Sequence, residues 1–224
     1  MNTHLRKTLT PLVRRLRKFF HTPLEDLPHA PDLFQHYRGL ASHPQLIRRP
    51  GGWEYRDRFY PDYLTVGGAS FAIFRTANDF CKGNGLDIGA GLWPFPGATA
   101  IDIWRGSGAG RTLDDIPDGS QEYVFSSHCL EHSDEWMKEL SRWASKVKPG
   151  GHMFLYLPHP DCGIWNPGSP LVGSGHKWQP EPPLIKKALN VHGFDVVACD
   201  DGPDWMFSFF VCGRKAPTGA VGSA

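Results

Sequence analysis

Two glycines that follow an apolar run are the first sign of chemistry in this chain. Residues 86–91 read LDIGAG, and a second apolar run, residues 100–103, contains Asp102. Because glycine has no Cβ and adopts positive φ, such a turn lets the backbone approach a ligand closely. The Asp102 carboxylate beside this turn can accept hydrogen bonds from both hydroxyl groups of a ribose. These residues predict a site for a small molecule that contains a nucleoside.

The spacing of these residues separates two kinds of nucleotide ligand. The dinucleotide fingerprint has a third glycine and places its acidic residue about 20 positions further on. In this chain Pro94 stands where the third glycine would be, and Asp102 follows Gly91 at about half that distance. Residues 93–96 (WPFP) leave little room for a helix whose N-terminus would bind a pyrophosphate. The pattern disfavours nicotinamide dinucleotides and favours a nucleoside cofactor without phosphates.

A second group of reactive side chains lies in residues 126–132, which read SSHCLEH. His128 and His132 are our candidates for a general base, because imidazole titrates near neutral pH and a placed base contributes about 10²- to 10⁴-fold to a rate. The alternative for His132 is a structural role, as a helix cap or as a hydrogen-bond partner of the neighbouring loop. Three further residues share the candidacy for the base: His159, Asp161 and His176.

Residues 128–132 also match the H-x-x-E-H pattern of one class of zinc enzymes. That pattern requires both histidines on one side of a helix. Here it begins at the end of a predicted strand, and the helix is expected only from about Ser133. We therefore predict no metal site, and expect Glu131 to fix the loop or to lie beneath the acceptor. Zinc hydrolysis through His128 and His132 stays an alternative that requires stoichiometric metal surviving dialysis.

Alternating helices and strands must position these groups. The apolar patterns predict helices at residues 69–80, 134–147 and 183–191, and strands around Leu86 and at 100–103, 123–126, 153–157, 194–198 and 205–212. We expect an α/β fold: a Rossmann-like, mostly parallel seven-stranded sheet with an antiparallel final strand and helices on both faces. The carboxyl ends of the parallel strands would then gather the glycine turn, Asp102 and residues 126–128 at one rim.

Four segments make up the predicted organisation. Residues 1–20 are basic and have leucines at helical spacing, which predicts an amphipathic helix able to lie on anionic lipid or a partner protein, or a simple lead-in helix. Residues 21–66 are expected to be an irregular wrap. Residues 67–214 are expected to form the main domain, and residues 215–224 a flexible tail.

The composition excludes several other classes of protein. The 224 residues carry a net charge of +1, which offers no global attraction to nucleic acid. The five cysteines include no C-x-x-C pair, which argues against a disulfide framework or a zinc ribbon. We find no apolar run of the about 20 residues that cross a bilayer and no signal peptide. The sequence therefore predicts a cytoplasmic protein, peripheral to a membrane at most.

Five motifs in order resemble the class I S-adenosylmethionine-dependent methyltransferases, most of all the branch known as type 11 methyltransferase domains. They are residues 86–91 (LDIGAG), 101–103 (IDI), 116–120 (IPDGS), 123–132 (YVFSSHCLEH) and 147–151 (VKPGG). The resemblance covers residues 67–214 and implies S-adenosyl-L-methionine as the cofactor. The family places a full helix between the positions of Gly91 and Asp102, which this chain lacks.

The resemblance also implies a role for each matching residue. Gly89, Ala90 and Gly91 would pass beneath the methionine part of the cofactor, and Asp87 would support the turn or the amino group. Asp102 would bind the ribose, Ile103 would pack against adenine, and Leu113 and Asp114 would close over the adenine edge. Ser126, Ser127 and His128 would lie next to the transferable methyl group.

The function expected from these patterns is in-line methyl transfer from S-adenosylmethionine to a small molecule or glycan. The alternative is a scaffold or regulatory module that binds the cofactor without catalysis. Residues 158–182 form a long loop that could act as a lid or an acceptor wall, or could be a surface excursion. Aromatic side chains that could line the acceptor site are Trp53, Tyr55, Tyr60, Tyr63, Trp165 and Trp178.

Overall fold

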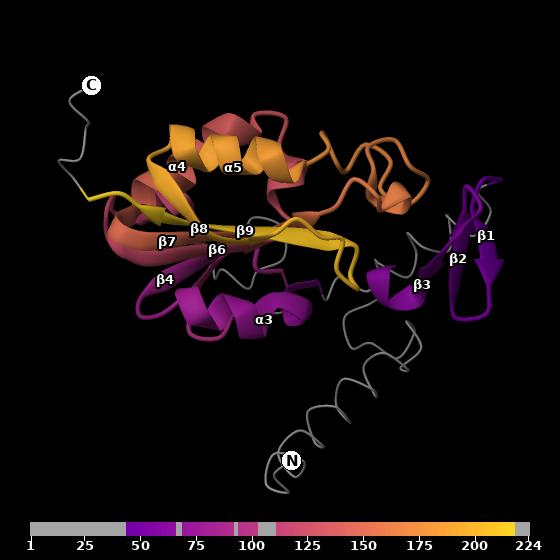
Figure 1. The fold of residues 1–224 in the computed structure, drawn as a ribbon, viewed down its shortest axis with the longest axis horizontal. Helices are drawn as coiled ribbons and strands as arrows, with labels where there is room; N and C mark the ends of the chain where they lie inside the picture. The colour runs from indigo at the N-terminus through magenta and orange to yellow at the C-terminus, as the bar shows by residue number, and fades with distance from the viewer. Residues whose placement is uncertain (1–43, 66–68, 92–93, 103–110, 218–224) are drawn as a thin grey trace, which may run out of the picture. The chain divides into compact units, whose positions relative to one another are not determined.

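The structure is a computed structural model that describes residues 44–65, 69–91, 94–102 and 111–217. The chain divides after Gly67 into two compact units. We call residues 1–67 the N-terminal unit and residues 68–224 the α/β unit, and we describe each by itself (Figure 1). The predicted basic helix, residues 1–20, lies outside the described residues.

The described part of the N-terminal unit is a small antiparallel sheet. Its strands are β1 (Ile47–Arg49), β2 (Gly52–Tyr55) and β3 (Arg58–Pro61), followed by the 3-10 helix η2 (Asp62–Thr65). Arg56 and Asp57 both have positive φ, as the two-residue turn between β2 and β3 requires. The expectation of an irregular wrap is wrong for this stretch. Strands this short show no clear alternation, and the Arg-Asp turn lacks the usual Asn-Gly signal.

The α/β unit has a six-stranded sheet in the order β5-β4-β6-β7-β9-β8. The strands are β4 (Gly85–Ile88), β5 (Thr99–Ile101), β6 (Gln121–Ser127), β7 (Val147–Pro158), β8 (Phe194–Asp200) and β9 (Ser208–Lys215). The first four are parallel, and β9 runs antiparallel to both β7 and β8. The predicted α/β class and the reversed final strand are confirmed.

The predicted number of seven strands is wrong for the described residues, in which the sheet has six. Between β5 and β6 the described chain forms the 3-10 helix η3 (Leu113–Asp115) and not a strand. Thr112 and Asp115 form a capping box there, because the Asp115 carboxylate accepts hydrogen bonds from the Thr112 N–H and hydroxyl. Residues 111–120 thus form turns and a 3-10 helix, and residues 103–110 lie outside the described residues.

Helices cover both faces of the sheet, as predicted (Figure 1). The helix α3 (Ala69–Phe80) lies on one face, and α4 (Trp136–Lys146) and α5 (Pro182–Val191) lie on the other. Alternate residues of the central strands are buried on opposite faces. The Phe125 ring packs with Phe95 and Phe154 on the face that α3 covers. The preceding residue, Val124, points to the other face and joins the aliphatic core beneath α4 and α5.

Several predicted boundaries shift in the structure, and the largest shift is in β7, which was predicted at residues 153–157 and begins at Val147. The helix predicted from residue 134 begins at Trp136, and β9 begins at Ser208 because residues 205–207 belong to the preceding turn. The predicted tail does not begin at 215: Lys215 ends β9, and its ammonium group donates hydrogen bonds to the carbonyls of Ala144 and Val147, at 2.8 and 2.7 Å, at the end of α4. Residues 218–224 lie outside the described residues.

Searched over its described residues, the chain has no helix with the length and apolar character needed to span a bilayer.

We predict that the buried face of α4 contributes strongly to the stability of the α/β unit. Leu140 is fully buried in the aliphatic core, whereas Met137 on the same helix is 39% exposed. Leu140→Ala should lower the free energy of unfolding by about 2–5 kcal/mol, because it leaves a cavity. Met137→Ala should change it by no more than about 0.5 kcal/mol. Urea unfolding curves measure both, and equal losses would contradict the assigned burial.

Candidate functional site

The glycine turn follows β4 at the carboxyl end of the parallel strands. Gly89 and Gly91 have φ of 78° and 55°, in the region that favours glycine. A Cβ added at Gly89 would lie 2.5 Å from both Cβ and Sγ of Cys129. The Gly89 N–H also donates to the Ile101 carbonyl of β5 at 2.9 Å. Backbone conformation and close packing therefore both require glycine at position 89.

Two of the predicted carboxylates hold this turn in place. The Gly91 N–H donates to Oδ2 of Asp102 at 2.6 Å, and the Phe95 N–H donates to Oδ2 of Asp87 at the same distance. Asp87 is only 2% exposed, and burial raises its pKa to about 7. The structure thus brings Asp87, the glycine turn and Asp102 together, as the sequence predicted. Ala90 lies buried between the two glycines.

Of the remaining residues predicted near adenine, the structure describes Leu113 and Asp114. Ile103 lies outside the described residues. Leu113 is buried in the aliphatic core, while Asp114 is exposed and forms an ion pair with Arg142 at 2.7 Å. Such exposed pairs contribute about 0–1 kcal/mol, so Arg142 does not fix Asp114 strongly. A contact of Asp114 with adenine stays a prediction.

The end of β6 is tied to its neighbours on both sides. The Ser126 hydroxyl donates to the Ile88 carbonyl of β4 at 2.8 Å, and Ser127 is the last residue of β6. His128 follows with φ of 50°, which is uncommon for residues other than glycine. Its N–H donates to the Tyr156 carbonyl of β7 at 2.9 Å. Hydrogen bonds to β4 and to β7 therefore fix the backbone at the end of β6, and with it the position of the His128 Cα.

The His128 ring is engaged on several sides. Its Nε2 is 2.9 Å from the Ser208 hydroxyl of β9, and its ring meets the Trp165 ring edge to face, with centroids 4.7 Å apart. Burial lowers the pKa of His128 to about 3. The ring is therefore neutral near neutral pH, and so low a pKa makes it a poor proton acceptor. The role of His128 as a base stays a prediction that this environment weakens.

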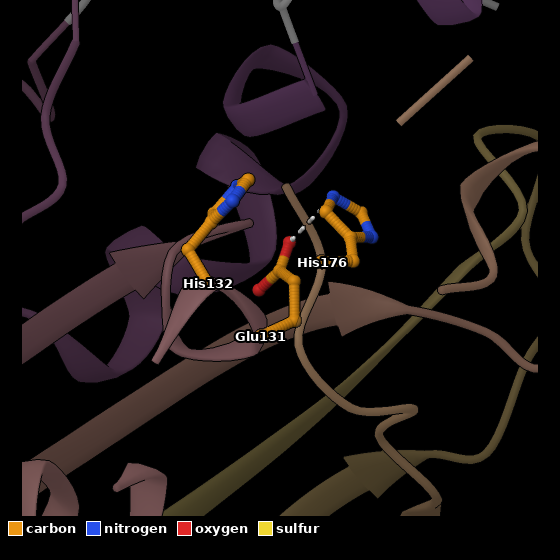
Figure 2. A group of neighbouring side chains, drawn as sticks. All are labelled: Glu131, His132 and His176. Carbon is orange, nitrogen blue, oxygen red and sulfur yellow. Dashed lines mark ion pairs between the residues drawn. The ribbon is translucent and has the colours of Figure 1, made fainter. Parts of the chain in front are cut away.

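A cluster of three ionisable side chains lies just beyond, formed by Glu131, His132 and His176 (Figure 2). Glu131 and His132 belong to the 3-10 helix η4 (Leu130–His132). Glu131 is completely buried, and neither carboxylate oxygen has a hydrogen-bond partner among the described residues. Nε2 of His176 is 3.9 Å from Oε1 of Glu131.

Each histidine of the cluster uses Nδ1 for a backbone carbonyl. His132 Nδ1 is 2.9 Å from the Gly175 oxygen, and His176 Nδ1 is 2.6 Å from the Trp165 oxygen. Burial lowers the pKa of both imidazoles, that of His176 to about 4, and raises the pKa of Glu131 to about 8. The cluster therefore presents two neutral imidazoles around a carboxyl group that burial disfavours in its charged form.

Sequence reasoning missed this arrangement. His132 and the carbonyl that holds it are 43 positions apart in the chain, so no local pattern reveals their contact. The H-x-x-E-H pattern points to His128 instead of His176. In the structure His128 and His132 turn to different partners, Ser208 and Gly175, because residues 130–132 form a 3-10 turn and not an α-helix.

The long loop predicted as a lid or wall, residues 158–182, packs on the site. It contains the 3-10 helix η5 (Gly163–Trp165), and Trp165 is buried against His128. The Trp178 indole donates to the Leu130 carbonyl at 3.1 Å and stacks on Trp136 of α4. The loop is therefore folded and held by aromatic packing, and its role as a lid or acceptor wall stays a prediction. The other predicted aromatics, Trp53, Tyr55, Tyr60 and Tyr63, belong to the N-terminal unit.

A pocket lies beside His128, between α3 and the paired strands β7 and β9. Its lining includes Tyr156, Asp204, Trp205 and Ser208, the last of which contacts His128. The Tyr156 hydroxyl donates to Oδ2 of Asp204 at 2.5 Å. Trp205 is 51% exposed. The pocket thus offers a polar pair and an accessible indole ring close to the end of β6.

We predict that Asp87 makes folding pH dependent. Its pKa is about 7 in the folded protein, against an ordinary value of 3.8 for the unfolded chain. The free energy of unfolding of the wild type should therefore fall as the pH rises from about 4 to 7 and stay constant above about pH 7. Asp87→Asn keeps an acceptor oxygen for Phe95 but cannot ionise. Relative to the wild type it should gain up to about 4 kcal/mol across this interval.

Urea unfolding at several pH values measures this effect. Asp195→Asn, an exposed position in β8, is the control and should follow the wild type. Parallel pH profiles for Asp87→Asn and the wild type would show that Asp87 ionises normally.

Comparison with known proteins gives matches in structure only. The chain matches no family model, and no curated protein matches it in sequence. Among solved structures, it is similar to an S-adenosylmethionine-dependent methyltransferase from Mesorhizobium loti, with a TM-score of 0.51 and 16% identity over 66% of this chain and 99% of that one. It is also similar to an S-adenosylmethionine-dependent methyltransferase from Thermotoga maritima described as a possible histamine N-methyltransferase, with a TM-score of 0.50 and 12% identity over 66% and 89% of the two chains.

Both solved structures are described as S-adenosylmethionine-dependent methyltransferases, and both are less than 25% identical to this chain. At such identities they establish the fold. This chain therefore has the fold of the class I S-adenosylmethionine-dependent methyltransferases.

Proposed function

We propose that this protein is an S-adenosylmethionine-dependent methyltransferase whose acceptor is a small molecule or a glycan. The observation that carries the proposal is the glycine turn closed by the Gly91–Asp102 hydrogen bond at the carboxyl end of β4. In open α/β sheets, ligands bind at this edge. Among the described residues, a Cβ built at Gly91 would meet no atom closer than 4.0 Å, which favours the close approach of a ligand there.

Each residue of the turn has a defined task in this proposal. The Asp102 carboxylate accepts the hydrogen bonds of the ribose hydroxyls while it holds Gly91. Asp87 stays buried and fixes the Phe95 backbone, so the turn keeps its shape before the cofactor arrives. Gly89, Ala90 and Gly91 lie beneath the methionine part. Preorganisation of this kind lowers the entropic cost of binding.

Bound S-adenosylmethionine supplies an electrophilic methyl group on a sulfonium. The protein's contribution is mainly position, because aligned reactants reach effective molarities of about 10⁵ M or more. Ser127, His128 and the packed wall around Trp165 limit the space for water at the end of β6. His128 and His132 are the proposed bases for acceptors that must lose a proton. The low pKa of His128 disfavours it, and His132 can accept a proton only while its Nε2 carries no other ligand.

The pocket at Tyr156, Asp204 and Trp205 is the proposed acceptor site. An exposed indole ring can stack on a sugar or on a planar molecule, and the adjacent carboxylate can orient a hydroxyl or amino group. This supports a small-molecule or glycan acceptor over a macromolecule. A contact of the basic residues 1–20 with an anionic membrane or a partner protein stays a prediction, since they lie outside the described residues.

We predict that the wild type binds both S-adenosylmethionine and S-adenosylhomocysteine in a calorimetric titration. Asp102→Ala should weaken both by at least about 100-fold, because it removes two charge-assisted hydrogen bonds that contribute about 1.5–3 kcal/mol each. Asp195→Ala, which removes an exposed carboxylate from β8, should bind as the wild type does.

Failure of the wild type to bind either compound would overturn the proposal. Binding of both without methyl transfer to any member of a panel of small molecules and glycans would favour the alternative, a cofactor-binding module without catalysis.

A further inference from the structure

The buried carboxylate of Glu131 is the observation that the proposed function leaves unexplained. Its side chain is 0% exposed, and neither oxygen has a hydrogen-bond partner among the described residues. Burying such a group without partners is costly, and native proteins almost always satisfy it. The nearest positively chargeable groups, His128 and His176, lie 3.8 and 3.9 Å away. A bound cation is the simplest partner for this carboxylate.

The two histidines of the cluster are arranged as metal ligands usually are. In His132 and in His176, Nδ1 faces a backbone carbonyl, which fixes the proton on Nδ1 and leaves the lone pair on Nε2. A hydrogen bond from the second ring nitrogen to a carbonyl is the usual support of a ligating histidine. One ligand atom from each of Glu131, His132 and His176 lies within 4.8 Å of the other two.

We propose that Glu131, His132 and His176 bind one divalent transition-metal ion of the Zn²⁺ class. Two imidazole nitrogens and one carboxylate favour such ions over Mg²⁺ and Ca²⁺, which prefer oxygen ligands. The same donor set, with an open coordination position, occurs in catalytic zinc sites. The ligands come from η4 and from the folded loop at His176, so the site closes only when that loop packs.

The ligand atoms must move closer to bind one ion. Bonds of about 2.0–2.1 Å in a tetrahedral site place ligand atoms about 3.4 Å apart. The Glu131 to His176 separation is 3.9 Å and the separations in the cluster reach up to 4.8 Å, so side-chain rotation, above all of the exposed His132 ring, must shorten them. His128 is not in the ligand set, because its Nε2 is committed to Ser208.

The position of this site gives the ion a task. Cys129, in contact with Gly89, lies two residues before Glu131 in the chain, so the site adjoins the glycine turn. An ion with three protein ligands can accept a water molecule or an oxygen of the acceptor in its open position. That task rests on the proposed function, whereas metal binding itself does not.

The test uses the full chain without S-adenosylmethionine, so that its outcome is independent of methyl transfer. Zn²⁺ is titrated calorimetrically into chelator-treated protein, and metal content is measured by mass spectrometry after dialysis. We predict one Zn²⁺ per chain and a rise in the melting temperature on binding. His132→Ala changes an exposed ring and should fold normally, yet bind Zn²⁺ at least about tenfold more weakly.

Two further variants separate ligation from folding. Glu131→Gln keeps the shape of the side chain and removes its buried charge, so it should be at least as stable as the metal-free wild type and gain no stability from Zn²⁺. His152→Ala, in β7 with its ring against Phe80, is the matched control and should bind Zn²⁺ as the wild type does. Zn²⁺ binding that is absent from the wild type, or equal in the wild type, His132→Ala and Glu131→Gln, would overturn the proposal.

Discussion

The close packing of Cys129 on Gly89 is the constraint on which the rest of the site depends. It brings the turn after β4 against the loop after β6. Any residue other than glycine at position 89 would clash, because its Cβ would lie 2.5 Å from the Cys129 side chain. Burial raises the pKa of the Cys129 thiol, so the side chain stays uncharged and packs as a small apolar group. The Ser126–Ile88 hydrogen bond holds the same two strands together just before this contact. The Gly89–Cys129 contact therefore helps to position both Asp102, which binds the glycine turn, and Glu131, which follows Cys129 in the chain.

The two faces of the sheet support this fit differently. The α3 face is built from interlocking aromatic rings around Phe125, whereas the α4 and α5 face is aliphatic. Asp87 is buried at the end of β4, and its contact with Phe95 connects the aromatic packing to the glycine turn. Buried ionisable groups gather at this rim because the fold collects strand ends there. Their shifted pKa values mark the region as one in which the charges of a ligand would be strongly felt.

Much of this arrangement is predictable from sequence, because local patterns determine it. Apolar alternation located the strands and helices, and the glycine spacing placed Asp102 at the turn. The short hairpin at Arg56 and Asp57 lacks the usual turn residues, so the sequence pattern did not reveal it. The cluster at Glu131 was beyond sequence reasoning, since His176 reaches it only through the packing of a long loop. The H-x-x-E-H pattern instead pairs His132 with His128, whose ring contacts Ser208 in the structure.

We propose that the glycine turn and Asp102 form the cofactor site. The most direct measurement is a crystal structure of the protein with S-adenosylhomocysteine bound. Our account predicts both ribose hydroxyls within hydrogen-bond distance of the Asp102 carboxylate and the homocysteine part against residues 89–91, with Cys129 still packed on Gly89. A ligand bound away from Asp102, or a turn that must separate from Cys129 to admit it, would contradict the account.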